Sequence, residues 1–156
     1  MTSGTWWAAP SRRRAGVALT LLVVLAVAGC GDDPGAVYRD SAVSALEGSL
    51  SEARTAELAG RLWVRDRSTH AFAVVVVGES DTGVGADAAW FEEQQPPRRA
   101  DDAVRQRTTE ALDGAASAVQ SVRIALERSD TVATHAALDG LRAACADLEA
   151  LAGELS

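Results

Sequence analysis

The stretch LDGLRAACADLEALAGEL, residues 138–155, carries the clearest periodic signal in this chain of 156 residues. Its apolar residues recur at alternating steps of three and four, at Leu138, Leu141, Cys145, Leu148, Ala152 and Leu155. This spacing places all of them on one face of an α-helix, as in helices that pack lengthwise against other helices. The end of the chain therefore predicts a helical bundle.

Two earlier segments, residues 37–65 and 98–128, have the same kind of pattern. The apolar positions of the first are Val43, Leu46, Leu50 and Ala53, followed after a phase shift by Leu58 and Leu62. Those of the second are Val104, Thr108, Ala111, Ala115, Ala118, Val122 and Ala125, broadened by Leu112, Val119 and Leu126. Each segment predicts a long helix with one apolar face.

The boundaries between these helices carry turn and capping residues. Residues 66–69, with the sequence DRST, predict a turn, and Ser68 or Thr69 can cap the helix that follows. Pro96-Pro97 ends the second helix, because the residue before a proline is displaced from helical backbone angles. Ser129-Asp130 predicts a tight turn and an N-cap before the last helix.

Residues 69–95 allow two interpretations. Four consecutive valines, Val74 to Val77, favour a strand, and three glycines follow that could form a hairpin loop. Against this, Phe72, Val76, Ala86 and Trp90 keep a helical stripe, and a lone hairpin would leave exposed strand edges. We predict a helix that is kinked or loosened near Gly83 and Gly85. The alternative is a β-hairpin at about residues 71–92.

Four helices of similar length with short connections predict an all-α, up-down-up-down bundle over residues 37–156. In the alternative fold, three long helices would surround the hairpin. Few aromatic residues follow the N-terminal segment, so we expect a core made chiefly of Leu, Val and Ala.

The N-terminal segment has the order of a secretory signal. Arg12 to Arg14 precede an apolar run from Ala15 to Ala28, which is shorter than the roughly 20 residues that a membrane span needs. The run ends in Val27-Ala28-Gly29-Cys30, which resembles the lipobox of bacterial lipoproteins. The arginines partly resemble a twin-arginine signal in an imperfect register, and the general secretory route is the default.

The lipobox resemblance implies a lipoprotein with three parts. Residues 1–29 would be a cleaved signal peptide, and Cys30 would carry the acyl chains, such as palmitate, that anchor the protein to the membrane. Residues 30–36 would be a short polar tether. The protein would then lie on the extracytoplasmic face of the cell membrane.

Composition limits the partners of such a chain. Removal of residues 1–29 leaves 12 arginines against 22 acidic residues, a formal charge of −10. Nucleic acid and anionic lipid surfaces would repel this domain. After lipidation of Cys30, Cys145 is the one remaining thiol, so neither an internal disulfide nor a zinc site built of cysteines can form.

The chain resembles small actinobacterial lipoproteins. The resemblance rests on the lipobox, on Phe91 with Gln95-Pro96-Pro97, and on three further groups of residues. These groups are Ser51, Thr55-Ala56, Leu58-Ala59 and Leu62; Arg123 with Ala125-Leu126; and Asp130. The absence of lysine and the many Ala, Arg and Val residues fit a GC-rich genome of that kind. The resemblance implies an all-helical domain and brings no activity with it.

Motifs for catalysis are incomplete. Asp81-Thr82-Gly83 matches the short motif of aspartic proteases, but no second copy exists. Residues 78–82 begin like a nucleophile elbow, yet Thr82 stands where glycine is required. Cys145 lies on the apolar stripe and is expected to be a small core residue. We therefore expect no enzyme and no cofactor.

His70 and His135 are the weak candidates for a metal site. His70 lies near the start of the second predicted helix and His135 near the start of the fourth. An up-down-up-down bundle therefore brings both to one end, with Asp66, Glu127 and Asp130. No ligand pair at helical spacing supports a site there. We expect a membrane-anchored accessory or interaction module with an envelope protein as a possible partner. The alternative is an extracytoplasmic domain that senses a cation or small ligand.

Overall fold

The computed structural model of the protein describes residues 33–156, which form four long α-helices. These are α2 (Pro34–Val64), α3 (His70–Glu92), α4 (Asp102–Glu127) and α5 (Thr131–Leu155). A short 3-10 helix, η1 (Arg99–Asp101), leads into α4. Residues 33–156 contain no strand, so the predicted all-α fold is confirmed and the hairpin alternative is wrong.

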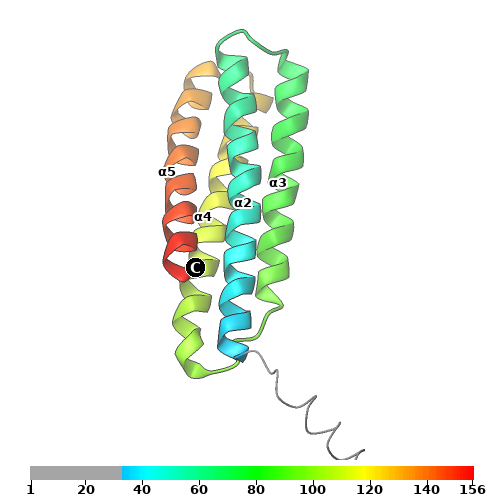
Figure 1. The fold of residues 1–156 in the computed structure, drawn as a ribbon. Helices are drawn as coiled ribbons and strands as arrows, with labels where there is room; N and C mark the ends of the chain where they lie inside the picture. The colour runs from blue at the N-terminus through cyan, green and yellow to red at the C-terminus, as the bar shows by residue number, and fades with distance from the viewer. Residues whose placement is uncertain (1–32) are drawn as a thin grey trace, which may run out of the picture. The chain divides into compact units, whose positions relative to one another are not determined.

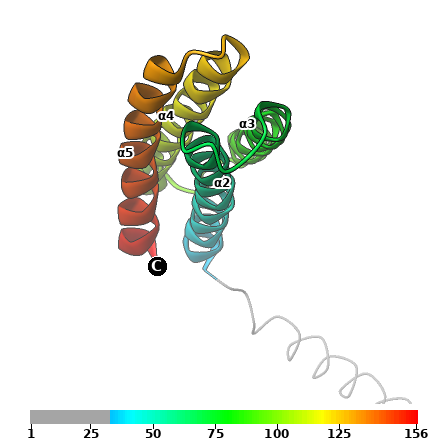
Figure 2. The same cartoon turned by 90° about the horizontal axis from the view of Figure 1, so that it is seen from above.

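The helices run alternately up and down, and each lies beside the next one along the chain (Figure 1). The view along the bundle in Figure 2 shows α5 returning to pack beside α2. α2 and α4 also touch across the middle of the bundle. The whole hydrophobic core described lies within residues 33–156, which form a compact unit of their own.

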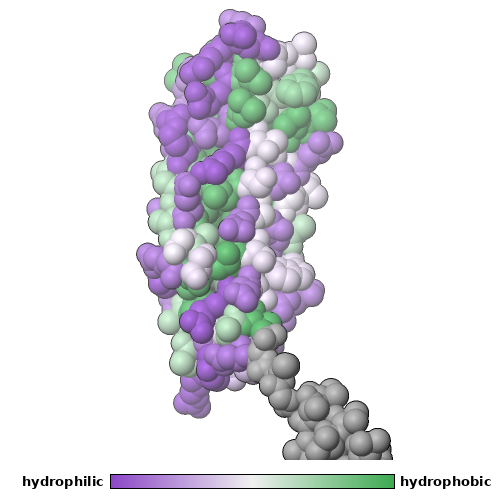
Figure 3. Space-filling model, in the orientation of Figure 1, coloured by the Kyte–Doolittle hydropathy of each residue, from purple (hydrophilic) through white to green (hydrophobic). Residues whose placement is uncertain are grey.

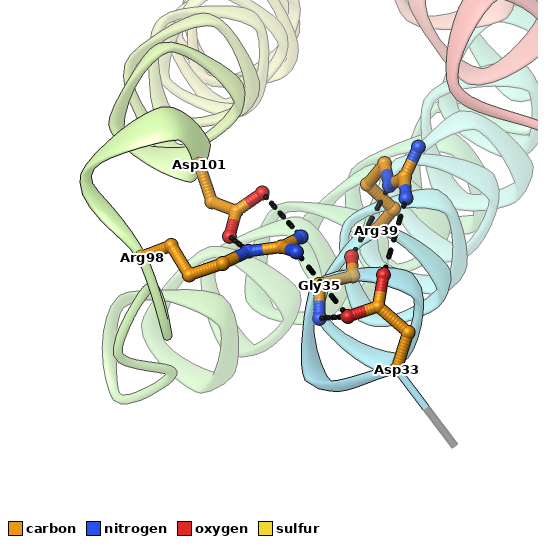
Figure 4. A network of polar contacts seen from close by, with 5 residues as sticks. All are labelled: Asp33, Gly35, Arg39, Arg98 and Asp101. Atoms are coloured by element: carbon orange, nitrogen blue, oxygen red, sulfur yellow. Dashed lines mark hydrogen bonds and ion pairs between the residues drawn. The ribbon is translucent and has the colours of Figure 1, made fainter.

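The first helix begins three residues before the predicted domain boundary at Val37. Pro34 occupies its first turn, where a missing N–H costs nothing, and the Asp33 carboxylate accepts a hydrogen bond from the Gly35 N–H at 3.3 Å. Asp33 also pairs with Arg98 at 3.3 Å (Figure 4). The residues predicted as tether from Pro34 to Ala36 are therefore helical.

Arg98 joins the connection between α3 and α4 to the start of α2. Its guanidinium donates to both oxygens of Asp101, which is buried, and to Asp33 (Figure 4). A Cβ at Gly35 would fall 1.4 Å from the Arg98 Nη2. A larger residue at Gly35 would displace the end of the Arg98 side chain from this position.

The predicted turns at the other end of the bundle are present. Thr69 caps α3 by accepting from the Phe72 N–H at 3.2 Å, and Asp130 caps α5 by accepting from the Ala133 N–H at 2.9 Å. Asp66 and Ser129 each adopt a φ of 54°, which reverses the chain after α2 and α4. The sequence predicted both caps because Thr and Asp accept backbone hydrogen bonds at helix starts.

The core follows the predicted stripes on α4, on α5 and on the first part of α2. In the second part of α2 the prediction is wrong, because Leu58 is exposed and Leu62 is only partly buried. On α5 the stripe is buried at Leu138, Leu141, Cys145, Leu148 and Ala152. On α4 the buried apolar residues are Leu112, Ala115, Val119, Val122, Ala125 and Leu126, and on α2 they include Leu46, Leu50 and Ala53. Leucine, valine and alanine thus fill most of the core, as predicted.

α3 departs from the prediction in two ways. It is unbroken through Gly83 and Gly85, so the expected loosening there is absent. The predicted stripe also faces the wrong way, because Phe72 and Trp90 are exposed. The buried residues of α3 stand one position later along the helix, at Ala73, Val77, Ser80, Val84 and Phe91.

Candidate interaction surface

The outer face of α3 is apolar and made of small residues. It runs along the helix at steps of four and three, and consists of Ala71, Val75, Gly78, Thr82, Gly85 and Ala89. A Cβ added at Gly78 or Gly85 would meet no atom within 4 Å, so both glycines face open space. We call these six residues the α3 stripe.

Large exposed apolar side chains lie on the α3 stripe, at Val75, and beside it. Phe72 is 51% exposed, Val75 58% and Trp90 45%. Leu58, on the neighbouring α2, is 59% exposed. Figure 3 shows hydrophobic residues gathered at the upper part of the face formed by α2 and α3. Within residues 33–156, this surface thus holds most of the large exposed hydrophobic side chains.

A shallow apolar groove of about 120 Å³ crosses from α2 to α3 beside the α3 stripe. It is lined by Thr55, Leu58, Ala59, Leu62, Phe72 and Val76. A groove of this size accepts one apolar side chain rather than a small-molecule ligand, which needs several hundred cubic ångströms.

The other outer helix faces are polar by comparison. The exposed positions of α5 include Asp139, Arg142, Asp147 and Glu149, whereas Glu79 and Glu92 are the exposed acids of α3, which has no Lys or Arg. Asp81 and Asp87 of α3 are partly buried, so Glu79 and Glu92 are the charged side chains that its outer surface exposes. The outer surface of α3 is therefore less charged than that of α5.

The two ends of the α3 surface carry opposite charges. Arg65 and Arg67 lie just before α3, on either side of Asp66, and Glu92 and Glu93 lie at its end. All four charged side chains are exposed, and none makes an ion pair with another residue between 33 and 156. They are free to pair with charges on another surface.

The inner side of α3 meets α2 through small and polar residues. The Ser49 hydroxyl donates to the Asp87 carboxylate at 3.3 Å, and a Cβ at Gly48 would fall 2.7 Å from the same oxygen. Burial raises the pKa of Asp87, the Ser49 hydrogen bond lowers it, and the charge of Glu52 raises it again. This seam is closely packed and electrostatically unfavourable at neutral pH.

His70 and His135 lie at the same end of the bundle, as predicted. The His70 Nε2 lies 2.7 Å from the Leu126 carbonyl oxygen and must donate to it, because a carbonyl only accepts. The His70 ring also packs against Trp63 at 5.6 Å. Among residues 33–156 no group of three or more His, Cys, Asp or Glu could hold a metal ion. His70 thus joins the α2–α3 turn to the end of α4.

The residues of the incomplete catalytic motifs take part in an ion pair and in packing inside the bundle. Asp81 pairs with Arg123 of α4 at 2.9 Å, and Ser80 is buried in the middle of α3. Cys145 is buried on the α5 stripe, and burial raises the pKa of its thiol.

The lipobox residues Val27, Ala28, Gly29 and Cys30 lie outside the described residues, as do the predicted signal peptide and the start of the tether. No helix between residues 33 and 156 has the length and hydropathy of a membrane span. No protein-family model, curated protein or solved structure matches the chain.

The pattern of large apolar residues in the sequence does not locate the α3 surface, because Phe72 and Trp90 lie beside the α3 stripe and not within it. The available signal was the scarcity of charge between residues 70 and 91 together with the heptad spacing of Gly78, Thr82 and Gly85.

Proposed function

We propose that the protein is a non-enzymatic lipoprotein of the cell envelope that presents the outer face of α3 to another protein surface. The lipobox motif Val27-Ala28-Gly29-Cys30 supports the anchor. The single observation that carries the interaction role is the exposed apolar face of α3, with Phe72, Val75 and Trp90 each about half accessible. Apolar patches on soluble domains mark binding surfaces more often than isolated exposed residues do.

A lipid anchor on Cys30 would be joined to the bundle by a short linker. Two residues separate Cys30 from Asp33, the N-cap of α2, and three residues of extended chain reach at most about 11 Å. The end of the bundle that holds the start of α2 and Pro96-Pro97 would therefore lie near the membrane. The turns at Asp66 and Ser129 lie at the opposite end of the bundle from the start of α2.

Replacement of the lipidated cysteine tests the anchor. In the full chain, Cys30→Ala should abolish incorporation of labelled palmitate and move the protein from the membrane fraction to the medium or soluble fraction. Cys145→Ala is the matched control, because it removes the other thiol from a buried position and leaves the lipobox intact. Membrane retention and labelling of the Cys30→Ala protein would contradict the proposal.

A further inference from the structure

We propose that the second half of α3, residues 83–92, docks on α2 through a seam that responds to pH. This half is held most firmly in acid and opens more often as the pH rises to neutrality. The docking lies inside the bundle, so it goes beyond the proposed function and needs no partner for the outer face of α3. Its basis is a pair of carboxylates, Glu52 of α2 and Asp87 of α3, that the fold holds on one seam.

Each of the two helices places a carboxylate over a glycine of the other. The Asp87 Oδ2 lies 2.7 Å from the point where Gly48 would carry a Cβ, and the Glu52 Cδ lies 2.9 Å from the same point on Gly83. The absence of a side chain at both glycines leaves the space that the two acids occupy. Four residues separate the glycine from the acid on each helix, so the two contacts lie about one helical turn apart.

No arginine neutralises this pair of acids among residues 33–156. Neither Glu52 nor Asp87 makes an ion pair there. On α4, Arg123 pairs with Asp81, and Arg105 donates to backbone oxygens at the end of α3 and just after it. The residues of α3 three and four positions from Asp87 are uncharged. Glu52 is thus the charged side chain that acts on Asp87 from the helices packed against α3.

The closed seam favours the protonated form of Asp87. Burial raises the pKa of its carboxyl most, the Ser49 hydrogen bond lowers this pKa, and the charge of Glu52 raises it. When residues 83–92 open, water replaces these influences and the pKa returns toward its ordinary value of 3.8. The closed state therefore binds the proton more tightly than the open state. Acid favours closing, and this preference is lost as the pH rises through the raised pKa.

The first half of α3 is attached at two points that do not involve this seam. The His70 Nε2 donates to the Leu126 carbonyl oxygen at 2.7 Å, and the Asp81 carboxylate pairs with Arg123 at 2.9 Å. Both contacts join α3 to α4 rather than to α2. They hold residues 70–81 in place when the seam at Asp87 loosens.

The second half of α3 has a sequence that opens readily. It begins with Gly83 and Gly85, and glycine is among the weakest helix formers. Val84 and Phe91 are its buried residues. Segments with few buried apolar side chains open locally at lower free energy than the whole domain unfolds. Residues 83–92 can therefore respond to a single proton while the rest of the bundle stays folded.

Amide hydrogen exchange at a series of pH values from 4 to 8 tests the docking. Residues 33–156 hold their own core, and protection factors correct for the intrinsic effect of pH on exchange. The ratio of protection in residues 83–92 to protection in the central turns of α5 should be higher at pH 4 than at pH 8. It should change by at most about tenfold per pH unit, because one proton is linked to closing. A ratio that does not vary with pH would overturn the proposal.

Two substitutions should move the midpoint of this pH dependence in opposite directions. Glu52→Gln removes a charge that raises the pKa of Asp87, so the midpoint should move to lower pH. Ser49→Ala removes the hydrogen bond that lowers the same pKa, so the midpoint should move to higher pH. Mere loosening of the helix would change protection at every pH and leave the midpoint in place. Unmoved midpoints, or shifts in the same direction, would contradict the role of the two carboxylates.

Removal of the titrating group completes the test. Asp87→Asn should abolish the pH dependence of the ratio, since asparagine keeps the size of the side chain and carries no proton to exchange. Glu79→Gln is the matched control, because Glu79 is an exposed acid of the same helix without an ion pair in residues 33–156, and it should keep the pH dependence. A pH dependence that survives in Asp87→Asn would overturn the proposal. None of these results alters the Cys30→Ala experiment, which tests the anchor alone.

Discussion

The Asp87 carboxylate lies in surroundings that disfavour its negative charge. It lies where α3 meets α2, receives one hydrogen bond from Ser49, and has the Glu52 carboxylate nearby instead of an arginine. Burial is the largest cause of its raised pKa, and the charge of Glu52 adds to it, while Ser49 opposes both. The folded state therefore binds the Asp87 proton more tightly than the unfolded chain does.

The sign of the resulting pH dependence follows from proton linkage. Between the ordinary pKa of 3.8 and the raised folded value, the folded state carries more proton, so the Asp87 contribution to the free energy of unfolding falls as pH rises. Above the folded pKa the whole penalty is present. Asp87→Asn should accordingly raise Tm at pH 7 and give a smaller gain at pH 3, where aspartate is largely protonated in both states.

Thermal unfolding followed by circular dichroism at the two pH values would measure this difference. Asp113→Asn is the control, because Asp113 is exposed on α4 and has no ion pair within residues 33–156, so its replacement should move Tm little. A lower Tm for Asp87→Asn at pH 7 would mean that the charge stabilises the seam.

At the scale of elements, packing in α3 overrides the preference of its valines for strands. Four consecutive valines favour a strand, yet Val77 is buried in the core and Val75 points outward from the same helix. The other helices offer α3 a surface to pack against, and none of the described residues offers a neighbouring strand. The helical state of this segment could be predicted, because the segment is about as long as the neighbouring helices and keeps a helical spacing of apolar residues.

The face of α3 that is buried could not be predicted from the same spacing. Phe72 and Trp90 define one stripe, and Val77, Val84 and Phe91 define another a single position later. Hydrophobicity alone favoured the larger exposed pair, and only the packed bundle distinguishes the two stripes. The same holds for Arg98, whose contacts with Asp33 and Asp101 depend on how the α3–α4 connection returns to α2.

Close approach of helices makes two glycines respond differently to the same change. A Cβ at Gly60 of α2 would lie 2.9 Å from Leu138 and 3.5 Å from Val122, both in the core, whereas a Cβ at Gly140 of α5 meets nothing within 4 Å. Alanine in an exposed helix position gains up to about 1 kcal/mol over glycine. Overfilling a packed core costs about 1–3 kcal/mol.

Gly60→Ala should therefore lower the free energy of unfolding by about 1 kcal/mol, the difference between these two effects. Gly140→Ala should raise it by about 0.5–1 kcal/mol. Urea unfolding of both variants would measure the change through the midpoint, with an unchanged slope showing that the unfolded surface is the same. Equal stabilisation by both substitutions would show that α2, α4 and α5 have room to separate at Gly60.

At the scale of the whole molecule, the core is unevenly distributed. α3 contains no leucine. Its buried residues are Ala73, Val77, Ser80, Val84 and Phe91, and Phe91 packs on Tyr38 with ring centroids 5.7 Å apart. α5 buries Leu138, Leu141, Leu148 and Leu151. The three leucine-bearing helices thus supply most of the buried apolar residues, and α3 supplies the fewest.

Regions with few buried apolar contacts open at lower free energy than the global core does. Backbone amides of α3 should therefore exchange hydrogen at least about tenfold faster than those of α5, a difference of about 1.4 kcal/mol in opening free energy. Exchange followed by mass spectrometry on residues 33–156 would measure this difference. Exchange in α3 as slow as in α5 would show that the bundle opens as one unit and that its stability does not depend on leucine content.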